Sequence, residues 1–150
     1  MIETIIKICK VLDKNKIDYF ISGGSSLFLR NLITSTKDID ITVFFKDLKK
    51  IKFLFLGNKI ILEEKYRLVF DIDGCEIEFM GVPKAKDPIS FEVLKNKSKM
   101  VDVLIVNDRK LNLIKIEQLL KLYKLVYNRG GCKIQKHKKR IEFLEKIINE

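Results

Sequence analysis

The sequence predicts an α/β, or α+β, fold, because helical and strand periodicities follow one another along its 150 residues. Three observations carry this prediction. Apolar residues recur at helical spacing in the N-terminal segment, which indicates an amphipathic helix. Asp73-Gly74, typical of a type I′ turn, separates strand-like runs over 66–72 and 75–80. A Gly-Gly-Ser-Ser turn precedes a strand in which acidic and apolar residues alternate. The length favours a single domain over residues 1–150.

The first half of the chain is predicted to form the core of this fold, over about residues 1–82. The apolar face of the first helix is formed by Ile2, Ile5, Ile6, Cys9 and Leu12. The following elements are a strand over 17–22, a helix over 26–32, a strand over 37–45, a helix over 46–55 that ends near Gly57-Asn58, and the hairpin.

The second half begins with a loop over 81–88 that carries Lys84 and Lys86. We expect a basic helical part over about 108–150, preceded by a strand over 101–106. A helix over 116–128 is predicted to stop at Arg129-Gly130-Gly131. The last helix would dock through Ile141, Leu144 and Ile148.

The formal net charge of +10 is unevenly distributed. Residues 1–80 contain 13 basic and 12 acidic residues, whereas residues 81–150 contain 17 and 8, which gives +1 and +9. A basic half favours anionic partners such as nucleotides or RNA. Lysines that only solvate helices in a lysine-rich proteome explain the same charge equally well, so both interpretations stay open.

Two patterns that define other classes of protein are missing from the sequence. No stretch reaches the roughly 18 consecutive apolar residues of a membrane helix, and no signal-peptide pattern is present, so we expect a cytoplasmic protein without membrane attachment. Cys9, Cys75 and Cys132 are far apart and lack a Cys-x-x-Cys spacing. We therefore expect buried or idle thiols and no disulfide framework or zinc site.

The most informative residues are Asp38 and Asp40. On a strand, Asp38, Asp40 and Thr42 point to one face, while Ile39 and Ile41 point to the opposite face and into a core. Two carboxylates on one face are costly unless a cation joins them. Mg²⁺ is the usual candidate, because it takes hard oxygen ligands and completes its shell with water and substrate phosphates.

Glu76 and Glu78 repeat this pattern on the second strand of the hairpin. If that strand lies beside the one that carries Asp38, up to four carboxylates face one cleft and require bound cations. Such a site suits two-metal catalysis of displacement at phosphorus. Taken alone, Glu76 and Glu78 would indicate an exposed strand of an antiparallel sheet.

The turn Gly23-Gly24-Ser25-Ser26 ends a strand and begins a helix. Small residues there let a phosphate approach backbone N–H groups, and Ser25 and Ser26 can add hydroxyl donors. Such turns are common, so the informative feature is the position of this one ahead of Asp38-x-Asp40.

With these motifs the sequence resembles the nucleotidyltransferases of the DNA polymerase β superfamily. Ile21–Ser25, Thr36–Ile41 and Ile77–Phe79 are similar, in order, to the family's strand and glycine turn, its Asp-x-Asp strand and its third acid. The Thr-Lys-Asp-Ile-Asp form is particularly similar to the minimal and abortive-infection types. The run from Glu117 to Lys121, with Arg129 and Lys136, resembles the family's helical tail, whose basic residues would face nucleotide phosphates.

The resemblance implies a nucleotidyltransferase fold, with a small mixed sheet, helices on one face, the active site on the other, and C-terminal helices. It implies transfer of a nucleoside monophosphate from an NTP to an acceptor hydroxyl, with two Mg²⁺ ions, or Mn²⁺, as cofactors. Asp38, Asp40 and Glu78 would be catalytic and hold the metals, with Glu76 as the alternative third acid. Nucleotide binding would fall to Gly23, Gly24, Ser25, Ser26, Lys121 and Lys124. No role is expected for His137, which follows Lys136 on a solvated basic face.

The family as a whole modifies tRNA ends, proteins and small hydroxylated drugs, and the basic second half favours RNA, including tRNA, or protein as the acceptor. The resemblance also suggests the toxin or effector of a toxin–antitoxin or phage-defence pair, with an antitoxin or a second copy of the chain as a partner that completes the cleft. The alternative, from a different class, is a non-catalytic nucleotide- or RNA-binding, antitoxin-like module with the same fold. Because all three acid positions are filled, the enzyme is favoured.

Overall fold

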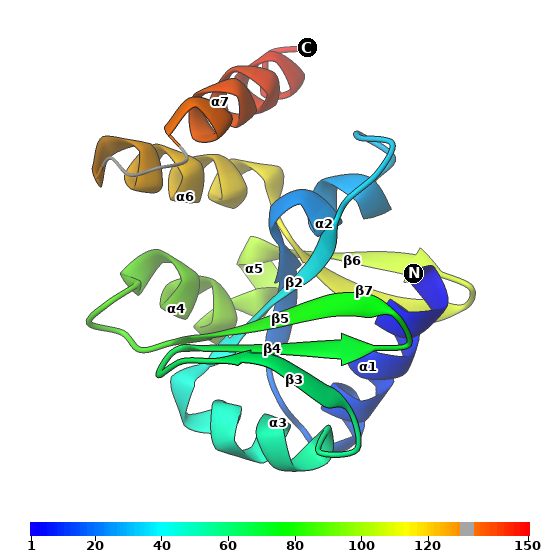
Figure 1. The fold of residues 1–150 in the computed structure, drawn as a ribbon. Coiled ribbons are helices and arrows are strands. Elements are labelled where there is room, and N and C mark those ends of the chain that lie inside the picture. The colour runs from blue at the N-terminus through cyan, green and yellow to red at the C-terminus, as the bar shows by residue number, and fades with distance from the viewer. Residues whose placement is uncertain (130–133) are drawn as a thin grey trace.

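A computed structural model describes residues 1–129 and 134–150 of the chain (Figure 1). No helix in these two ranges is long and apolar enough to cross a membrane. The helices are α1 (Ile2–Lys14), α2 (Gly23–Leu29), the short 3₁₀ helix η1 (Phe45–Asp47), α3 (Leu48–Leu54), α4 (Pro88–Lys95), α5 (Lys97–Met100), α6 (Ile116–Arg129) and α7 (Ile134–Ile148). The strands are β1 (Tyr19–Ser22), β2 (Asp38–Phe44), β3 (Lys59–Glu63), β4 (Arg67–Ile72), β5 (Cys75–Val82), β6 (Val101–Val106) and β7 (Arg109–Ile114).

All of these strands belong to one mixed sheet, in the order β3-β4-β5-β2-β1-β7-β6. β2 pairs in parallel with β5, and β1 in parallel with β7, whereas the other neighbours are antiparallel. The predicted α/β fold is therefore confirmed. The strand that carries Asp38 and Asp40 lies at the centre of the sheet, between β5 and β1.

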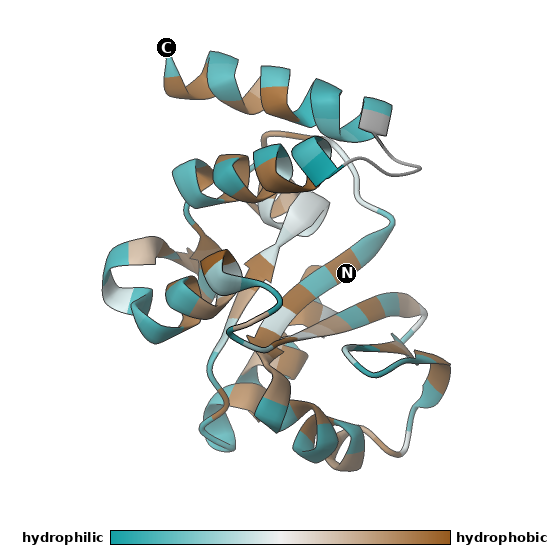
Figure 2. Ribbon diagram, turned by 90° about the vertical axis from the view of Figure 1, so that its left-hand side faces the viewer, coloured by the Kyte–Doolittle hydropathy of each residue, from teal (hydrophilic) through white to brown (hydrophobic). Residues whose placement is uncertain are grey.

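Helices cover both faces of the sheet (Figures 1 and 2). On one face, Ile5, Ile8 and Leu12 of α1 pack with α3 against the apolar side chains of β2. The acids of β2 lie on the opposite face, as predicted. The prediction that helices cover only the face away from the site is wrong, because α2, α4, α6 and α7 pack on the acid-bearing face around a second cluster, which includes Phe20, Leu27, Val93, Leu119 and Leu144. Figure 2 shows the alternation of hydrophilic and hydrophobic residues along the strands that separates the two faces.

The hairpin between β4 and β5 forms as predicted. Asp73 and Gly74 have φ angles of 53° and 80°, the left-handed values that a type I′ turn requires at both central residues. A second hairpin, between β6 and β7, was missed because its turn, Asn107-Asp108, reaches positive φ angles without a glycine. Residues 109–114 are therefore a strand, and the helical part expected from about residue 108 begins at Ile116.

The helix α4 and the strand β3 are also absent from the sequence prediction. The Asp87-Pro88 pair, interpreted as the end of a loop, starts α4: Ser90 N–H donates to the Asp87 carboxylate at 3.0 Å, and Pro88 is the first helical residue. β3 is a largely exposed edge strand, so it lacks the alternation of buried and exposed residues that would reveal it.

The described cysteines are free thiols, as expected. Cys9 is buried, and burial raises the pKa of its thiol to about 12, which makes it unreactive near neutral pH. Cys75 is half-buried. Cys132 and the predicted helix stop at Gly130-Gly131 lie outside the described residues.

Candidate metal and nucleotide site

Three carboxylates come together on the second face of the sheet. The parallel register places Asp40 of β2 directly opposite Glu78 of β5, and Asp38, two residues earlier on β2, lies on the same face. One carboxylate oxygen from each of these three residues lies within 4.8 Å of the others, and all three side chains are half-buried. Glu76 is opposite Asp38 in the register but is exposed and not part of the group. The geometry therefore groups Glu78, and not Glu76, with the two aspartates.

These three carboxylates, which we call the acidic triad, repel one another. Burial, followed by repulsion from Asp38 and Glu78, raises the pKa of Asp40 to about 8, and Lys136 offsets part of that effect. Glu78 also has a cationic neighbour, since Arg67 Nε donates to its Oε1 at 2.5 Å. A divalent cation would relieve the repulsion, because the triad offers it hard oxygen ligands at the spacing of one coordination shell.

Gly23 allows the acidic triad to form at the end of β1. Its φ angle is +58°, and a Cβ atom at this position would lie 2.2 Å from Asp40 Oδ2. Any side chain here would therefore displace the carboxylate as well as strain the backbone. Gly24 lies close to two side chains: a Cβ there would be 3.2 Å from Arg140 Nη2 and 3.2 Å from Thr36 Oγ1.

Ser25 and Ser26, for which nucleotide binding is predicted, are enclosed within the turn. Both are fully buried, and their hydroxyls donate to the carbonyls of Ser22 at 2.7 Å and Gly23 at 2.8 Å. Ser25 Oγ also accepts a hydrogen bond from the Asp40 N–H at 3.0 Å. Neither serine lines the cavity at the acidic triad, because both hydroxyls donate hydrogen bonds to backbone carbonyls at the start of α2. They fix the turn and the backbone of Asp40.

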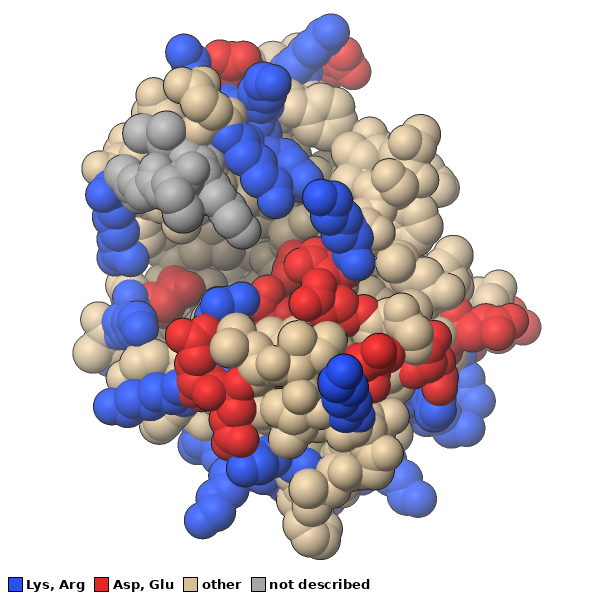
Figure 3. All heavy atoms as spheres, in the orientation of Figure 1, with Lys and Arg blue, Asp and Glu red and all other residues tan. Residues whose placement is uncertain are grey.

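A cavity of about 700 Å³ lies above the acidic triad. In Figure 3, acidic atoms gather at the centre of this face, beneath basic atoms of the C-terminal helices. The cavity is bounded by the β1–α2 turn, by the segment that leads into β2, and by side chains of α6 and α7. Its lining residues are Gly23, Gly24, Ser35, Thr36, Lys37, Asp38, Asp40, Glu78, Tyr123, Lys136, His137 and Arg140.

The basic residues of this cavity are Lys37, Lys136 and Arg140, not the predicted pair from α6. Lys124 points to α7, where its Nζ lies 3.1 Å from Glu145 Oε1. Lys121 lines a separate hollow beside α4. The physical reason is helical phase: Tyr123 faces the cavity, and residues one or two positions away on a helix are rotated by about 100° or 200°.

Tyr123 and His137 were not predicted to be near the site. Burial raises the pKa of Tyr123, and the Arg140 guanidinium, whose Nη1 lies 3.5 Å from its hydroxyl, partly counters this rise. The rings of Tyr123 and His137 lie 5.7 Å apart. His137 is half-buried at the cavity and not on a fully solvated face. The run of lysines around it concealed this position, although the spacing from Lys136 to Arg140 is that of one helix face.

Compared by sequence, the chain matches no protein-family model and no curated protein. Compared by structure, it is similar to solved nucleotidyltransferases over nearly its whole length. A nucleotidyltransferase-like protein from Thermotoga maritima has a TM-score of 0.65 at 18% identity, over 99% of this chain and 92% of that one. The lincosamide antibiotic adenylyltransferase LnuA, bound to lincomycin, has a TM-score of 0.61 at 16% identity, over 95% of both chains.

A third solved structure is ANT(2″)-Ia in complex with adenylyl-2″-tobramycin, with a TM-score of 0.65 at 14% identity, over 98% of this chain and 87% of that one. The chain therefore has the nucleotidyltransferase fold, and the predicted resemblance is confirmed at the level of the fold. The acidic triad adds a candidate site for a divalent cation on the strands β2 and β5.

The role of Gly23 can be tested against Gly74, whose φ angle is also positive but whose surroundings are open. Gly74→Ala adds backbone strain alone and should cost on the order of 1 kcal/mol of unfolding free energy. Gly23→Ala adds the clash with Asp40 and should cost at least about 2 kcal/mol more. Urea unfolding measures both costs. Equal losses in the two variants would show that the contact with Asp40 does not constrain the site.

The raised pKa of Asp40 predicts a pH dependence of stability. Aspartate in an unfolded chain has a pKa of about 3.9, so between that pH and about 8 the folded, metal-free protein holds a proton that the unfolded chain has lost. The free energy of unfolding should therefore fall as pH rises through this range. In Asp40→Asn the fall should be smaller by on the order of 2 kcal/mol, measured by urea unfolding in the presence of a chelator. The same slope in both proteins would contradict the assignment.

Proposed function

We propose that this chain is a metal-dependent nucleotidyltransferase that transfers a nucleoside monophosphate from an NTP to an acceptor hydroxyl and releases pyrophosphate. One observation supports this proposal most strongly: an acidic triad at the floor of a cavity whose opposite wall carries Lys136 and Arg140. Carboxylates for a cation and basic groups for phosphates, on opposite sides of one cavity, suit a metal-bound triphosphate. The nucleotidyltransferase fold agrees with this assignment.

Asp38, Asp40 and Glu78 are the proposed metal ligands. Mg²⁺, or Mn²⁺, bound there as a pair of ions, would neutralise the developing charge on the phosphates and activate the attacking oxygen. The acceptor oxygen bonds to the α-phosphorus as the bond from phosphorus to the pyrophosphate oxygen breaks. Glu78 is the proposed base for the hydroxyl proton, and Arg67 holds its carboxylate in place through the 2.5 Å hydrogen bond.

Lys136 and Arg140 are the proposed partners of the nucleotide phosphates, in place of Lys121 and Lys124. Arg140 lies close to Gly24, since a Cβ atom there would be 3.2 Å from its Nη2, so the glycine lets the guanidinium and the backbone of the turn line the same side of the cavity. Gly23 and Gly24 line the same cavity and are proposed to bind the nucleotide, as the sequence predicts. Ser25 and Ser26 support it indirectly, through the turn.

ATP is the first nucleotide to test, because LnuA is an adenylyltransferase and ANT(2″)-Ia was solved with an adenylylated product. The role as toxin or effector, with an antitoxin partner or a second copy of the chain, stays a prediction. It requires a separate test, in which growth is followed during expression of the chain.

Transfer of labelled nucleotide tests the function. We expect wild-type protein, given Mg²⁺ and α-labelled NTPs, to label a component of cellular RNA or protein covalently. Asp40→Asn should lower this labelling by at least about a hundredfold, because it removes a charged metal ligand. Glu76→Gln is the matched control, since it neutralises an exposed acid of β5 outside the acidic triad.

The control should label normally. Full labelling by Asp40→Asn, or equal loss in both variants, would contradict the mechanism. Nucleotide binding by the folded wild-type protein without any labelling would favour the non-catalytic module.

A further inference from the structure

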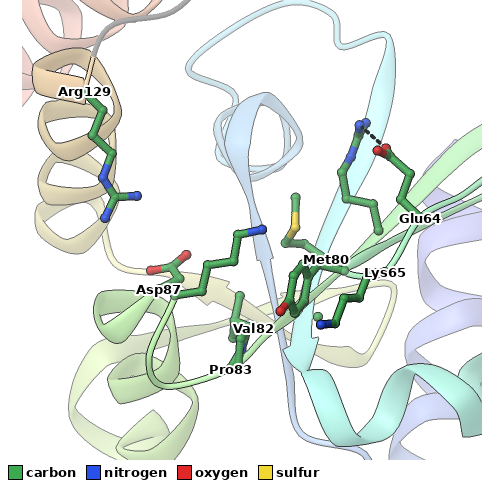
Figure 4. Close-up of a pocket in the computed structure, with 11 residues that line it drawn as sticks. Glu64, Lys65, Met80, Val82, Pro83, Asp87 and Arg129 are labelled. Carbon is green, nitrogen blue, oxygen red and sulfur yellow. Dashed lines mark hydrogen bonds and ion pairs between the residues drawn. The ribbon is translucent and has the colours of Figure 1, made fainter.

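A second cavity, of about 370 Å³, lies beside the acidic triad at the far end of β5 (Figure 4). Figure 4 shows Arg129 reaching toward it from α6 and Glu64 and Lys65 on the opposite side, with Val82 and Pro83 between them. Basic side chains outnumber acidic ones in its lining, which consists of Glu64, Lys65, Tyr66, Arg67, Met80, Gly81, Val82, Pro83, Lys86, Asp87 and Arg129.

Tyr66 is the aromatic side chain of this cavity, and two lysines lie over its ring. Lys86 Nζ is 4.0 Å and Lys65 Nζ is 5.3 Å from the ring centroid. Lys86 belongs to the loop over 83–87, between β5 and α4, whose lysines are left without a role by the proposed function. If the exposed lysine side chains swing off the ring to adjacent phosphates, the ring can stack on a base between them.

Lysines beside aromatic rings also line an adjoining hollow of about 380 Å³, which shares Val82 and Pro83 with the second cavity. The ring of Phe45 lies 5.1 Å from that of Tyr66 and connects the two hollows. Beyond it, Lys46 lies over the Phe44 ring at 5.4 Å and Lys95 over the Phe91 ring at 5.9 Å. All four lysine–ring contacts recorded for the described residues thus lie on one strip.

We call this surface the lysine–aromatic strip; it consists of Phe44, Phe45, Lys46, Lys65, Tyr66, Lys86, Phe91 and Lys95. It leads directly to the acidic triad, because Arg67 lines the second cavity and bonds to Glu78 at 2.5 Å. Met80 and Asp87 line both the second cavity and a smaller hollow that contains Asp40 and Glu78.

The parallel strands β2 and β5 set the direction of the strip. Both run from the acidic triad toward it, since Asp40 precedes Phe44 on β2 and Glu78 precedes Val82 on β5. The cavity with Lys136 and Arg140 lies at the opposite end of these strands, where Thr36 and Asp38 line it. An acceptor on the strip and a triphosphate in that cavity would therefore approach the acids from opposite sides, as in-line displacement requires.

We propose that the lysine–aromatic strip binds a single-stranded nucleic acid and directs its terminal hydroxyl to the acidic triad. The alternation of π-faces and cations fits bases and phosphates together, whereas an acidic protein would use the cations alone and a polycation would be repelled. The inference that nucleic acid is the acceptor rests on the proposed function. The inference that the strip binds nucleic acid can be tested without NTP or metal.

Fluorescence anisotropy with a labelled single-stranded RNA of about 12 nucleotides provides the test, with DNA of the same sequence as a second arm. We expect Lys65→Gln/Lys86→Gln to weaken binding about tenfold and to reduce the salt dependence, because two phosphate contacts are lost. Tyr66→Leu should weaken binding about tenfold without changing the salt dependence, since it removes a stacking surface but no charge.

The matched control is Lys10→Gln/Lys14→Gln, which removes the same charge from exposed positions of α1 on the other side of the sheet. This control should bind almost as well as wild type. Tyr66 is half-buried, so thermal unfolding must show that Tyr66→Leu is folded. If that variant is not folded, the Lys65→Gln/Lys86→Gln variant, whose changed side chains are exposed, decides whether the strip binds nucleic acid.

Several results would overturn the proposal: equal weakening by the two lysine pairs, equal affinity for a duplex, or equally effective displacement by polyglutamate of matched charge. Tight binding of either RNA or DNA single strands supports it, and a preference between them identifies the sugar. If wild-type protein binds none of the four NTPs with Mg²⁺, while it and Asp40→Asn both bind single-stranded RNA through the strip, the strip is upheld and the proposed transfer is rejected.

Discussion

Repulsion among three carboxylates is the constraint around which the rest of the site is arranged. Asp38, Asp40 and Glu78 are held within 4.8 Å by the parallel pairing of β2 with β5, at the centre of a sheet whose other face is a continuous apolar core. The backbone cannot relax this contact without breaking the register. Neighbouring residues instead reduce the cost of the repulsion. Arg67 and Lys136 place positive charge beside the acids, and Gly23 leaves room for the Asp40 carboxylate.

The position of the acidic triad on β2 and β5 leaves a candidate binding surface at each end of these two strands. One end of β2 and β5 opens into the cavity under α7, where basic side chains suit a triphosphate, and the other end opens onto the lysine–aromatic strip. The acidic triad lies between them, on strands and not on loops, so its geometry is set by the sheet. Two anionic ligands could then meet at the acids only if a cation screens the charge.

The sequence predicted the part of this arrangement that depends on local pattern. Alternation along β2 and β5 placed the acids on one face, and the positions of Gly23 and Asp38 suggested the site. Strand pairing, which decides whether Glu76 or Glu78 lies beside the aspartates, depends on tertiary structure and could not be predicted from local pattern. The rotation of α6 and α7 about their axes could not be predicted either, because an amphipathic pattern shows which side is apolar but not which polar residues face a cavity. Lys121 was therefore predicted where Arg140 lies.

Calorimetric titration of ATP, with and without Mg²⁺, tests without any acceptor whether the acidic triad and the basic wall opposite form one nucleotide site. If they do, binding requires Mg²⁺ and weakens at least about tenfold in Lys136→Gln/Arg140→Gln, but less than about twofold in Lys121→Gln/Lys124→Gln. Binding that ignores Mg²⁺, or equal weakening by the two double variants, would contradict a single nucleotide site.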